Sequence, residues 1–421
     1  MTAATLIPTG RRTVDRQLAA GVTLALLGVM DLALFGLAGH TGTAKFGMSL
    51  AGASVHVPDL SLPARGTPIV AGAISIVLGA LRIRLDLSPA LRRTTMGAAI
   101  GLFLVSFLCW AAAGQTLSLV GLLQSTATRS IPIVLGALAG CLCERAGVIN
   151  IAIEGQLLLG AFVAAVAASA TGNLWVGLLT GSLAGGLLAA MLAAFAIAFV
   201  VDQVVLGVVL NVFASGLTGY LYDRILVTYQ RTLNQPPVFR NWKVPVLGDI
   251  PIIGPVFFDS NVFLYLTYGA LFLVQAFLFH TRWGLRVRAV GEHPVAAETV
   301  GIRVLATRYR NVILGGLVAG LGGAYLTIGS VGAFGKDISS GKGYIALAAL
   351  IFGRWTPLGA VGAALVFGFA DALQNVLSIL GTPIPSDVLL MLPYAATILV
   401  VAGLVGKVRA PAADGRPYVK S

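Results

Sequence analysis

The sequence has few charged residues for its length. Charged residues make up 10% of the 421 residues, whereas a soluble domain typically contains about 25%. Hydrophobic residues make up 57% of the chain. This composition excludes an ordinary soluble domain and favours a protein that crosses a membrane many times. The net charge is +12, but the arginines are scattered between apolar runs, so the sequence argues against a nucleic-acid partner.

Cysteine and histidine are also scarce. The three cysteines, Cys109, Cys141 and Cys143, lie in or beside apolar segments, and the C-x-C pair has no second ligand cluster. Packing therefore explains them better than metal binding. None of the four histidines stands at a metal-ligand spacing. Without a catalytic constellation, we predict no metal site and no enzymatic activity.

A phosphate-binding loop is missing as well. The stretch GAFGKD at 332–337 resembles one briefly, but Ser330 stands where the first glycine should be and Asp337 replaces the Ser/Thr. The chain cannot bind ATP through this motif. If the protein transports actively, its energy must come from another subunit or from an ion gradient, and we predict no cofactor bound by this chain.

Apolar runs of membrane-spanning length are abundant. They predict twelve crossings, at 17–39, 68–84, 94–113, 128–143, 150–170, 175–200, 204–222, 261–279, 308–328, 343–353, 357–380 and 387–406. A helix needs about 20 residues to cross a bilayer core. The runs at 128–143 and 343–353 are shorter, so ten full spans with two broken or re-entrant ones fit equally well. The first run is too long for a signal-peptide core and is predicted to be an uncleaved span.

Lysine and arginine predict the orientation. With the N-terminus inside, nineteen of these residues fall on the inner side and nine, Arg129 among them, on the outer side. This asymmetry favours a cytoplasmic location for both termini. The long outer segment from Asp223 to Ser260 contains proline and aromatic residues. It is predicted to be a lid or a docking surface for an external partner rather than a simple connection.

Polar residues inside the spans are candidates for a solute path, since burying them unsatisfied costs several kcal/mol. On a helix, Asn150 and Glu154 share one face, as do Asp371 and Asn375. The candidate path residues are Asn150, Glu154, Asn211, Asp371 and Asn375. Interhelical hydrogen bonding that holds the bundle is an equally open interpretation. For Asp202 and Glu144 we favour a structural or gating role, and for Asp31 a local pairing role.

The stretch from His280 to Arg310 is polar and rich in arginine, and apolar spans flank it. Pro294 can open a helix and Gly301 can close it, which leaves room for about two turns. A short capped helix in a basic loop is suited to docking a cytoplasmic partner. An ordinary positively charged inner loop is the alternative.

Glycine is abundant, with 52 residues, many of them inside the spans. Examples are Gly181, Gly185, Gly186, Gly315, Gly316, Gly320, Gly322, Gly323, Gly359, Gly362 and Gly368. Small residues about four apart allow helix backbones to approach closely, so these spans are predicted to form a tight bundle.

Five motifs in order carry a family resemblance. They are ERAGVINIAIEGQLLLGAF, DQVVLGVVLN, TRWGLRVRAVGEHPVAAETVGI, GYIALAALIFGRWTPLGAVGAALVFGFADALQ and APAADGRPY. Together they resemble the inner-membrane permease of bacterial ABC importers for nucleosides, within the branched-chain amino acid and simple-sugar permease superfamily. The resemblance covers roughly residues 128–418, and residues 1–127 match less distinctly.

The resemblance implies an all-α, polytopic transmembrane helix bundle of the type II ABC importer class, with short or broken helices. It divides the chain into N-terminal spans at 1–127, a permease core at 128–410, a cytoplasmic coupling loop at 280–310 and a cytoplasmic tail at 411–421. It places the ATPase-coupling helix at Gly291, Glu292, His293, Pro294, Ala296, Ala297 and Gly301.

The resemblance also implies partners. These are a second homologous permease, ATP-binding-cassette ATPase subunits that use ATP, and an extracytoplasmic substrate-binding protein or lipoprotein, all at the cell inner membrane with its lipid. The implied function is inward movement of nucleosides by alternating access. Alternatives are a simple-sugar, ribose-like permease, a proton-coupled secondary transporter using Asp31, Glu154 or Asp371, and a non-transporting scaffold. The sugar branch has a G-I-D-L-S-type motif, whereas residues 147–151 here read GVINI, as in the nucleoside pattern.

Overall fold

A computed structural model of the chain describes residues 10–39, 41–50, 55–382, 388, 391 and 409–419. The last predicted span, 387–406, lies outside these residues except at positions 388 and 391. The chain forms two compact units, one made of residues 1–120 and 375–386 and the other of residues 121–374 and 387–421. The division predicted at residues 127 and 128 stays a prediction.

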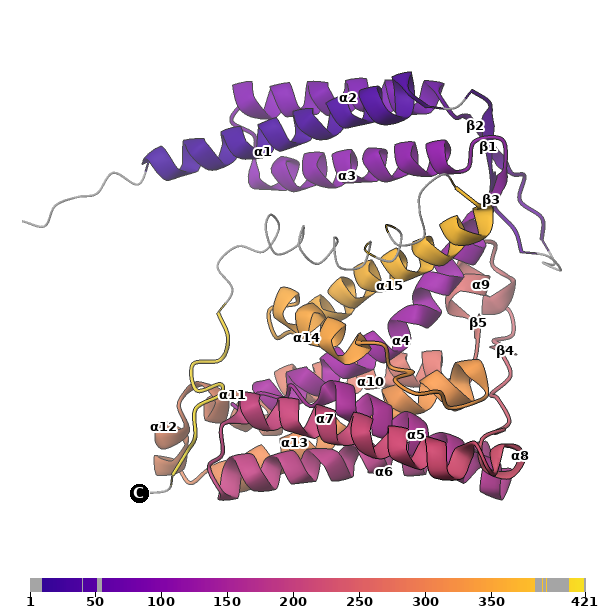
Figure 1. Cartoon of the computed structure of the whole chain (residues 1–421). Helices are drawn as coiled ribbons and strands as arrows, with labels where there is room; N and C mark the ends of the chain where they lie inside the picture. Colours follow the sequence, from indigo (N-terminus) through magenta and orange to yellow (C-terminus); the bar gives the residue numbers. More distant parts are fainter. Residues whose placement is uncertain are drawn as a thin grey trace, which may run out of the picture. The chain divides into compact units, whose positions relative to one another are not determined.

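Three long helices lie side by side in the first unit (Figure 1). They are α1 (Gly10–Met30, continued by a π-helical segment η1, Asp31–Leu37), α2 (Gly66–Arg84) and α3 (Pro89–Ala111). Glycines bring α1 and α2 together: a Cβ atom added at Gly28 would lie 2.6 Å from the carbonyl oxygen of Gly72, and one at Gly79 would lie 2.7 Å from that of Gly21. This close approach explains why small residues occupy both helices.

A small sheet completes the first unit. Its strands are β1 (Thr43–Gly47), β2 (Leu60–Pro63) and β3 (Thr116–Ser118), in the order β2-β1-β3. β1 pairs antiparallel with β2 and parallel with β3, so that Phe46 lies opposite both Leu60 and Leu117. Ala44 and Phe46 are buried on one face of β1, as the alternation of a strand requires.

Asp31 is buried among the three helices of the first unit. The hydroxyl of Ser75 on α2 is also buried, and it has no hydrogen-bond partner. The Ser106 hydroxyl on α3 donates to the Leu102 carbonyl at 2.9 Å and also faces the Asp31 carboxylate. The local pairing role that we favoured for Asp31 stays a prediction.

The second unit contains most of the remaining helices. It begins with α4 (Leu119–Glu144, whose first residues belong to the first unit), α5 (Ile153–Thr171), α6 (Leu174–Ala193) with η2 (Ala194–Ala198), and α7 (Gln203–Leu221) with η3 (Tyr222–Leu226). The short elements α8 (Gln230–Leu233), β4 (Trp242–Lys243), η4 (Leu247–Asp249), α9 (Ile253–Phe257) and β5 (Asp259–Ser260) follow. The remaining helices are α10 (Val262–His280), α11 (Arg282–Glu292), α12 (Pro294–Thr299), α13 (Val304–Leu326) with η5 (Thr327–Val331), α14 (Lys342–Phe352) and α15 (Pro357–Leu380, whose last residues belong to the first unit). η4 is a 3-10 turn, and η2, η3 and η5 are π-helical ends of the helices before them.

Ten helices in the described part of the chain are long and apolar enough to cross a membrane. The protein is therefore a polytopic helical membrane protein, as predicted. α14 has 11 residues and is a short apolar helix, which confirms that expectation for 343–353.

The expectation that 128–143 would be short was wrong, because α4 has 26 residues. Its first half carries several polar residues, and their hydroxyl groups bond back one turn. Thr126 donates to the Leu122 carbonyl at 2.8 Å, and Ser130 donates to the Thr126 carbonyl at 2.6 Å. These two hydroxyl groups are thus satisfied within the helix and do not require water.

Glycines bring α5, α6 and α13 into close contact, and the three helices pack together in the lower part of Figure 1. A Cβ atom added at Gly320 would meet the backbone of Gly181 and Ser182, and one at Gly316 would lie 2.6 Å from the Gly185 carbonyl oxygen. The predicted tight bundle is confirmed for these helices.

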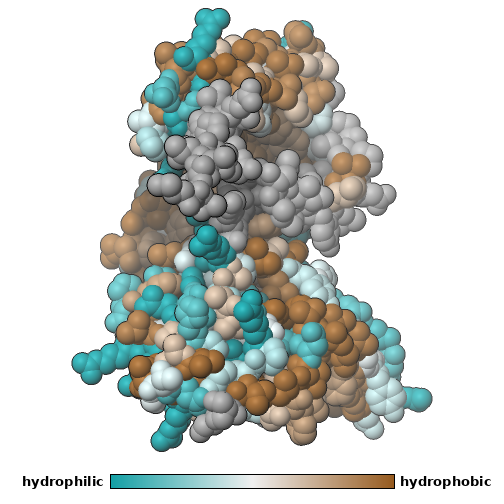
Figure 2. Space-filling view, turned by 90° about the vertical axis from the view of Figure 1, so that its left-hand side faces the viewer, coloured by the Kyte–Doolittle hydropathy of each residue, from teal (hydrophilic) through white to brown (hydrophobic). Residues whose placement is uncertain are grey.

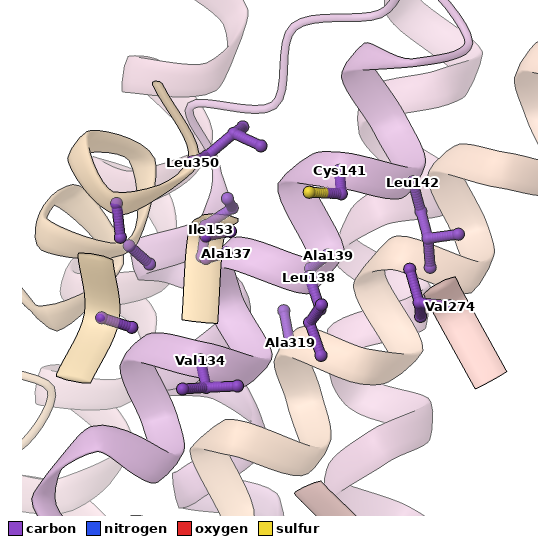
Figure 3. Packing of buried hydrophobic residues seen from close by; sticks show 14 of the residues in the cluster. Val134, Ala137, Leu138, Ala139, Cys141, Leu142, Ile153, Val274, Ala319 and Leu350 are labelled. Atoms are coloured by element: carbon purple, nitrogen blue, oxygen red, sulfur yellow. The ribbon is translucent and has the colours of Figure 1, made fainter. Parts of the chain in front are cut away.

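The largest hydrophobic core of the second unit surrounds α4 (Figure 3). The cluster contains Leu138 from α4, Ile153 from α5, Ala319 from α13 and Leu350 from α14, and all four side chains are 0% exposed. Helices distant in the sequence are thus fixed around α4. The same core includes residues from the end of α4 and the start of α5, which are the two places that carry the candidate site.

Hydrophobic side chains also cover much of the outer surface, as expected for helices in lipid (Figure 2). Examples are Val205, Val209 and Val212 on α7, which are 55–68% exposed. Hydrophilic side chains gather on the end of the second unit that carries α11 and α12 (Figures 1 and 2). This end is the one suited to an aqueous phase.

Candidate translocation and coupling site

The arginine-rich segment forms two helices, α11 and α12. The Thr281 hydroxyl caps α11 by accepting the Gly284 N–H at 3.1 Å. Pro294 is the first residue of α12, and Gly301 follows its end with φ +84°. The prediction that Pro294 opens and Gly301 closes a short helix is confirmed. Proline fits the first position because that N–H has no helical partner, and glycine fits the left-handed conformation.

The two faces of α12 differ in exposure. Ala297 is 3% exposed and packs in a small core with Val290 and Val304, whereas Val295 is 67% and Val300 75% exposed. Of the predicted coupling residues, Gly291 and Ala297 are buried, Pro294 is half-buried, and Glu292, His293, Ala296 and Gly301 are exposed. Sequence reasoning missed Val295 and Val300. Valine is unusual on an exposed helix within a loop, and this is the signal by which the sequence could have pointed to these two residues.

The turn after α4 holds the loop between α14 and α15. The Trp355 indole N–H donates to Glu144 Oε2 at 2.5 Å. Arg145 donates to the carbonyl oxygens of Trp355 at 2.7 Å and of Arg354 at 3.3 Å. Arg354 and Trp355 both have φ +54°, a strained conformation for residues other than glycine. These bonds hold the strained loop in place.

The same turn contacts the end of α11. A Cβ atom at Gly291 would meet the backbone carbonyl of Arg145 and would lie 3.4 Å from the N atom of Gly147. The glycine is needed for this close approach. The predicted coupling segment is therefore in direct contact with the turn between α4 and α5.

Asn150 and Gln156 form a closed pair at the start of α5. Gln156 Nε2 donates to Asn150 Oδ1 at 3.2 Å, and Asn150 Nδ2 donates to Gln156 Oε1 at 3.1 Å and to Cys143 Sγ at 3.4 Å. Asn150 and Gln156 are 0% exposed. In this conformation both amides are satisfied inside the chain, so they hold the turn between α4 and α5.

Asn211 on α7 bonds to the backbone at the start of α5. Its Oδ1 accepts the Gly155 N–H at 2.8 Å, and its Nδ2 donates to the Ile151 carbonyl at 2.9 Å and to the Tyr344 hydroxyl at 3.2 Å. Two turns earlier on α7, Gln203 Oε1 accepts the Ile149 N–H at 2.8 Å.

Asp202 is the N-cap of α7. Its Oδ1 accepts the backbone N–H groups of Val204 and Val205, each at 2.9 Å. The motif DQVVLGVVLN thus caps α7 and fixes the first turn of α5. This arrangement agrees with the structural role favoured for Asp202.

Glu154 binds the start of the short helix α14. Its Oε1 accepts the Ser339 hydroxyl at 2.6 Å and the Gly341 N–H at 2.8 Å, and its Oε2 accepts the Gly343 N–H at 2.6 Å. A carboxylate at the N-terminus of a helix is favourable for hydrogen bonding and for the helix dipole. Sequence reasoning could not identify this contact because the partners are far apart along the chain.

Asp371 on α15 forms an ion pair with Arg129 on α4. The Nη1–Oδ2 distance is 3.2 Å, and the side chains are 38% (Arg129) and 24% (Asp371) exposed. Arg129 was counted with the outer loops, and this was wrong: it lies inside α4. Asn375 lies one turn beyond Asp371 on α15 and falls in the first unit, so its part in a path with the other candidates stays a prediction.

The segment after α7 is attached to the loop before α14. Asn234 Nδ2 donates to the Phe334 carbonyl at 3.0 Å, and the Phe334 N–H donates to Asn234 Oδ1 at 2.7 Å. Lys336 pairs with Asp223 at 2.7 Å. Phe334 is therefore buried, with its ring against Phe162.

The comparisons with known proteins identify the family. Residues 122–401 match the family model described as branched-chain amino acid transport system / permease component. The chain belongs to this permease family.

Three relatives show how much of the chain is similar to known proteins. The permease is 41% identical over 315 residues to the guanosine ABC transporter permease protein NupQ of Bacillus subtilis, which covers 73% of this chain and 98% of the relative. It is 37% identical over 301 residues to the nucleoside ABC transporter permease protein NupC of Lactococcus lactis, covering 69% of this chain and 94% of the relative. A third relative is TsgC13 of Haloferax volcanii, which is provisionally named a glucose ABC transporter permease protein. It is 36% identical to this chain over 259 residues, and the alignment covers 60% of this chain and 77% of the relative. No solved structure matches the permease.

The family match contains α12 and all the candidate path residues of the permease, while the three helices of the first unit precede it. Within the described ranges, no group of three or more His, Cys, Asp or Glu is placed to hold a metal ion. The polar side chains bond mainly to one another and to backbone. Their roles in a substrate path stay predictions.

Proposed function

We propose that this chain is the permease subunit of an ABC importer that moves nucleosides into the cytoplasm by alternating access. The observation that carries the proposal is 41% identity to a guanosine permease over 98% of that relative's length. The family match, at residues 122–401, includes the segment that forms α12. The chain itself transports and is not an enzyme in this proposal.

ATP hydrolysis belongs to partner subunits in this proposal. The exposed side chains of Val295 on α12 and Val300 directly after it provide an apolar surface on an otherwise basic segment, which suits a groove in an ATP-binding-cassette subunit. A second homologous permease and an extracytoplasmic substrate-binding protein complete the importer. Both termini and α12 lie on the cytoplasmic side of the inner membrane, in line with the excess of arginine and lysine assigned to that side.

The proposed substrate path includes the ion pair of Arg129 and Asp371. Nucleosides carry ribose hydroxyls and base edges that form hydrogen bonds, and most bear no charge at neutral pH. A partly exposed carboxylate can accept bonds from a ribose diol, while a guanidinium group can donate to a base edge. Since a binding protein delivers the substrate, a weak internal site is sufficient.

A simple-sugar permease is the second candidate. Its support is the 36% identity to the relative provisionally named for glucose. A ribose-binding site would recognise the same hydroxyl groups that a nucleoside presents. The two candidates therefore differ in whether the base is required.

Uptake of labelled guanosine in cells that lack this gene, with and without the gene restored, tests the proposal. We expect restored uptake that other nucleosides compete for, that ribose and glucose do not, and that fails when the partner ATPase carries a substituted Walker lysine. Competition by sugars alone would favour the second candidate. Uptake that survives loss of the ATPase but stops with a proton uncoupler would replace both with a secondary transporter.

A further inference from the structure

The C-terminal segment at residues 409–419 lies against the coupling helices. The Ala413 N–H donates to the Gly291 carbonyl at 2.9 Å, and the Ala412 N–H donates to Glu292 Oε2 at 3.2 Å. The Tyr418 hydroxyl donates to the Glu298 carboxylate. The segment thus contacts the end of α11 and the second half of α12. Figure 1 shows it beside α11 and α12.

Tyr418 also belongs to the small core beneath α12. Its side chain is 8% exposed and packs with Val290, Ala297 and Val304. The tyrosine supplies the aromatic ring of this core. A helix of six residues is marginal alone, so such packing is needed to hold it in one position.

On its other side the segment contacts α13 and the turn after α4. Arg308, which is 2% exposed, donates from Nη1 to the Arg416 carbonyl at 2.9 Å. Asp414 hydrogen-bonds Glu144, the residue that also holds Trp355. A Cβ atom at Gly147 would lie 2.9 Å from Arg308 and 3.1 Å from the Ala413 carbonyl oxygen, so three parts of the chain meet there.

We propose that residues 409–419 are a strap that makes α12 rigid against the turn after α4, and that Tyr418 and Arg308 are positioning residues for energy coupling. This inference rests on the proposed function of α12. The turn leads directly to the Asn150–Gln156 pair and to α5. Movement of α12 by an ATPase would then reach α5 through the strap and the turn together.

The variants Tyr418→Ala and Tyr418→Phe test the strap, with Val419→Ala as the matched control because Val419 is 72% exposed. Hydrogen exchange of the purified permease gives a measurement that does not depend on transport. In Tyr418→Ala we expect exchange at residues 291–301 to be about tenfold faster or more, as for local opening of a weakened element. Tyr418→Phe should give a smaller increase, and Val419→Ala no change.

Coupling is measured in proteoliposomes that contain the complete importer. For Tyr418→Ala we expect ATPase association and basal hydrolysis to persist, while nucleoside uptake per ATP falls about fivefold or more, within the usual range of coupling energies. Unchanged exchange at 291–301, or unchanged uptake per ATP in Tyr418→Ala, would overturn the strap. If the unaltered importer carries no nucleoside, the proposed function fails, but the exchange measurement still decides whether the segment holds α12.

Discussion

The side-chain amides of Asn150 and Gln156 bond to each other in both directions, with N···O distances of 3.1 and 3.2 Å. Each amide satisfies the other in a site without exposure. The pair fixes the turn between α4 and α5, and a substrate could reach it only after a conformational change. The first measurable effect of breaking this pair should therefore be a change in the stability of the permease.

Asn150→Ala should lower the stability of the permease, because the Gln156 amide would be left buried without its partner, at a cost of about 1–3 kcal/mol. We expect a lower midpoint of thermal unfolding in detergent. The double variant Asn150→Leu with Gln156→Leu removes both partners and should recover part of this loss. A single variant that keeps full stability but loses uptake would return Asn150 to the substrate path.

The two alanines of α12 should respond differently to a charge. Ala296→Glu adds the charge to an exposed position, whereas Ala297→Glu places it in the core with Val290 and Val304. We expect Ala296→Glu to fold normally and to weaken ATPase association, and Ala297→Glu to disorder α12, as hydrogen exchange would report. Val295→Ser should also weaken association. Ala296→Ser, which adds no charge, is the control, and equal effects of both glutamates would contradict the assignment of the faces.

Attachment of the strap should depend on pH through Asp414. Burial first, and then the negative charge of Glu144 on α4, raise the pKa of Asp414 from 3.8 to about 9, while the Gly415 N–H and Arg308 on α13 act in the opposite direction. A raised pKa means that the docked segment holds the proton more tightly than the free one. Docking is therefore strongest at low pH and weakens as the pH rises from about 4 towards 9.

Hydrogen exchange at residues 412–418, corrected for the intrinsic effect of pH, measures this dependence. We expect protection to decrease between pH 6 and pH 9 in the unaltered permease. Asp414→Asn removes one carboxyl group of the Asp414–Glu144 pair and leaves only Glu144 to titrate there, so it should show a flatter profile. An unchanged slope in Asp414→Asn would remove Asp414 as its source.

Asp371→Asn should reduce uptake with a small effect on folding. The ion pair with Arg129 is partly exposed, and such pairs contribute about 1 kcal/mol or less. The substitution keeps the shape and one acceptor oxygen but removes the charge. Uptake assays beside thermal unfolding separate the two effects, and Val366→Ala, on an exposed position of the same helix, is the control. Normal uptake in Asp371→Asn would exclude the carboxylate charge from the path.

Cysteine labelling tests the orientation. Ser330 and Ala412 are both exposed, and Cys109, Cys141 and Cys143 are buried and should give little background. A membrane-impermeant maleimide applied to intact spheroplasts should label Ser330→Cys but label Ala412→Cys only after permeabilisation. The reverse pattern would invert the proposed topology.

The sequence predicted the elements whose signals are local. Pro294 marks the start of α12 and Gly301 follows its end, because each residue has its own backbone preference. Apolar runs mark the spans because a helix that crosses lipid needs about 20 apolar residues. α4 was misjudged because polar residues before 128 interrupt the apolar run from which the span was predicted, although hydroxyl groups there bond within the helix. Arg129 was missed for a related reason: its partner, Asp371, lies on a distant span.

The candidate site was predicted less well than the fold. The sequence identified the polar residues of the spans, because burying a polar group in lipid is costly and such residues are conspicuous among apolar ones. It did not identify the groups to which these residues bond. Glu154 binds the start of α14, and Asn211 binds the backbone of Ile151 and Gly155, and no local pattern specifies such distant contacts. Whether a polar group lines a path or closes a contact depends on tertiary packing, which the sequence does not display.

The glycine contacts of α13 with α5 and α6 have a consequence for the gene. Any single-nucleotide missense change in a glycine codon adds at least a Cβ atom, and at Gly316, Gly320 and Gly323 that atom would meet the backbone of a neighbouring helix. A deep mutational scan should therefore show a band of intolerance along one side of α13. In natural populations, these codons should accumulate synonymous changes while amino-acid replacements are removed by selection.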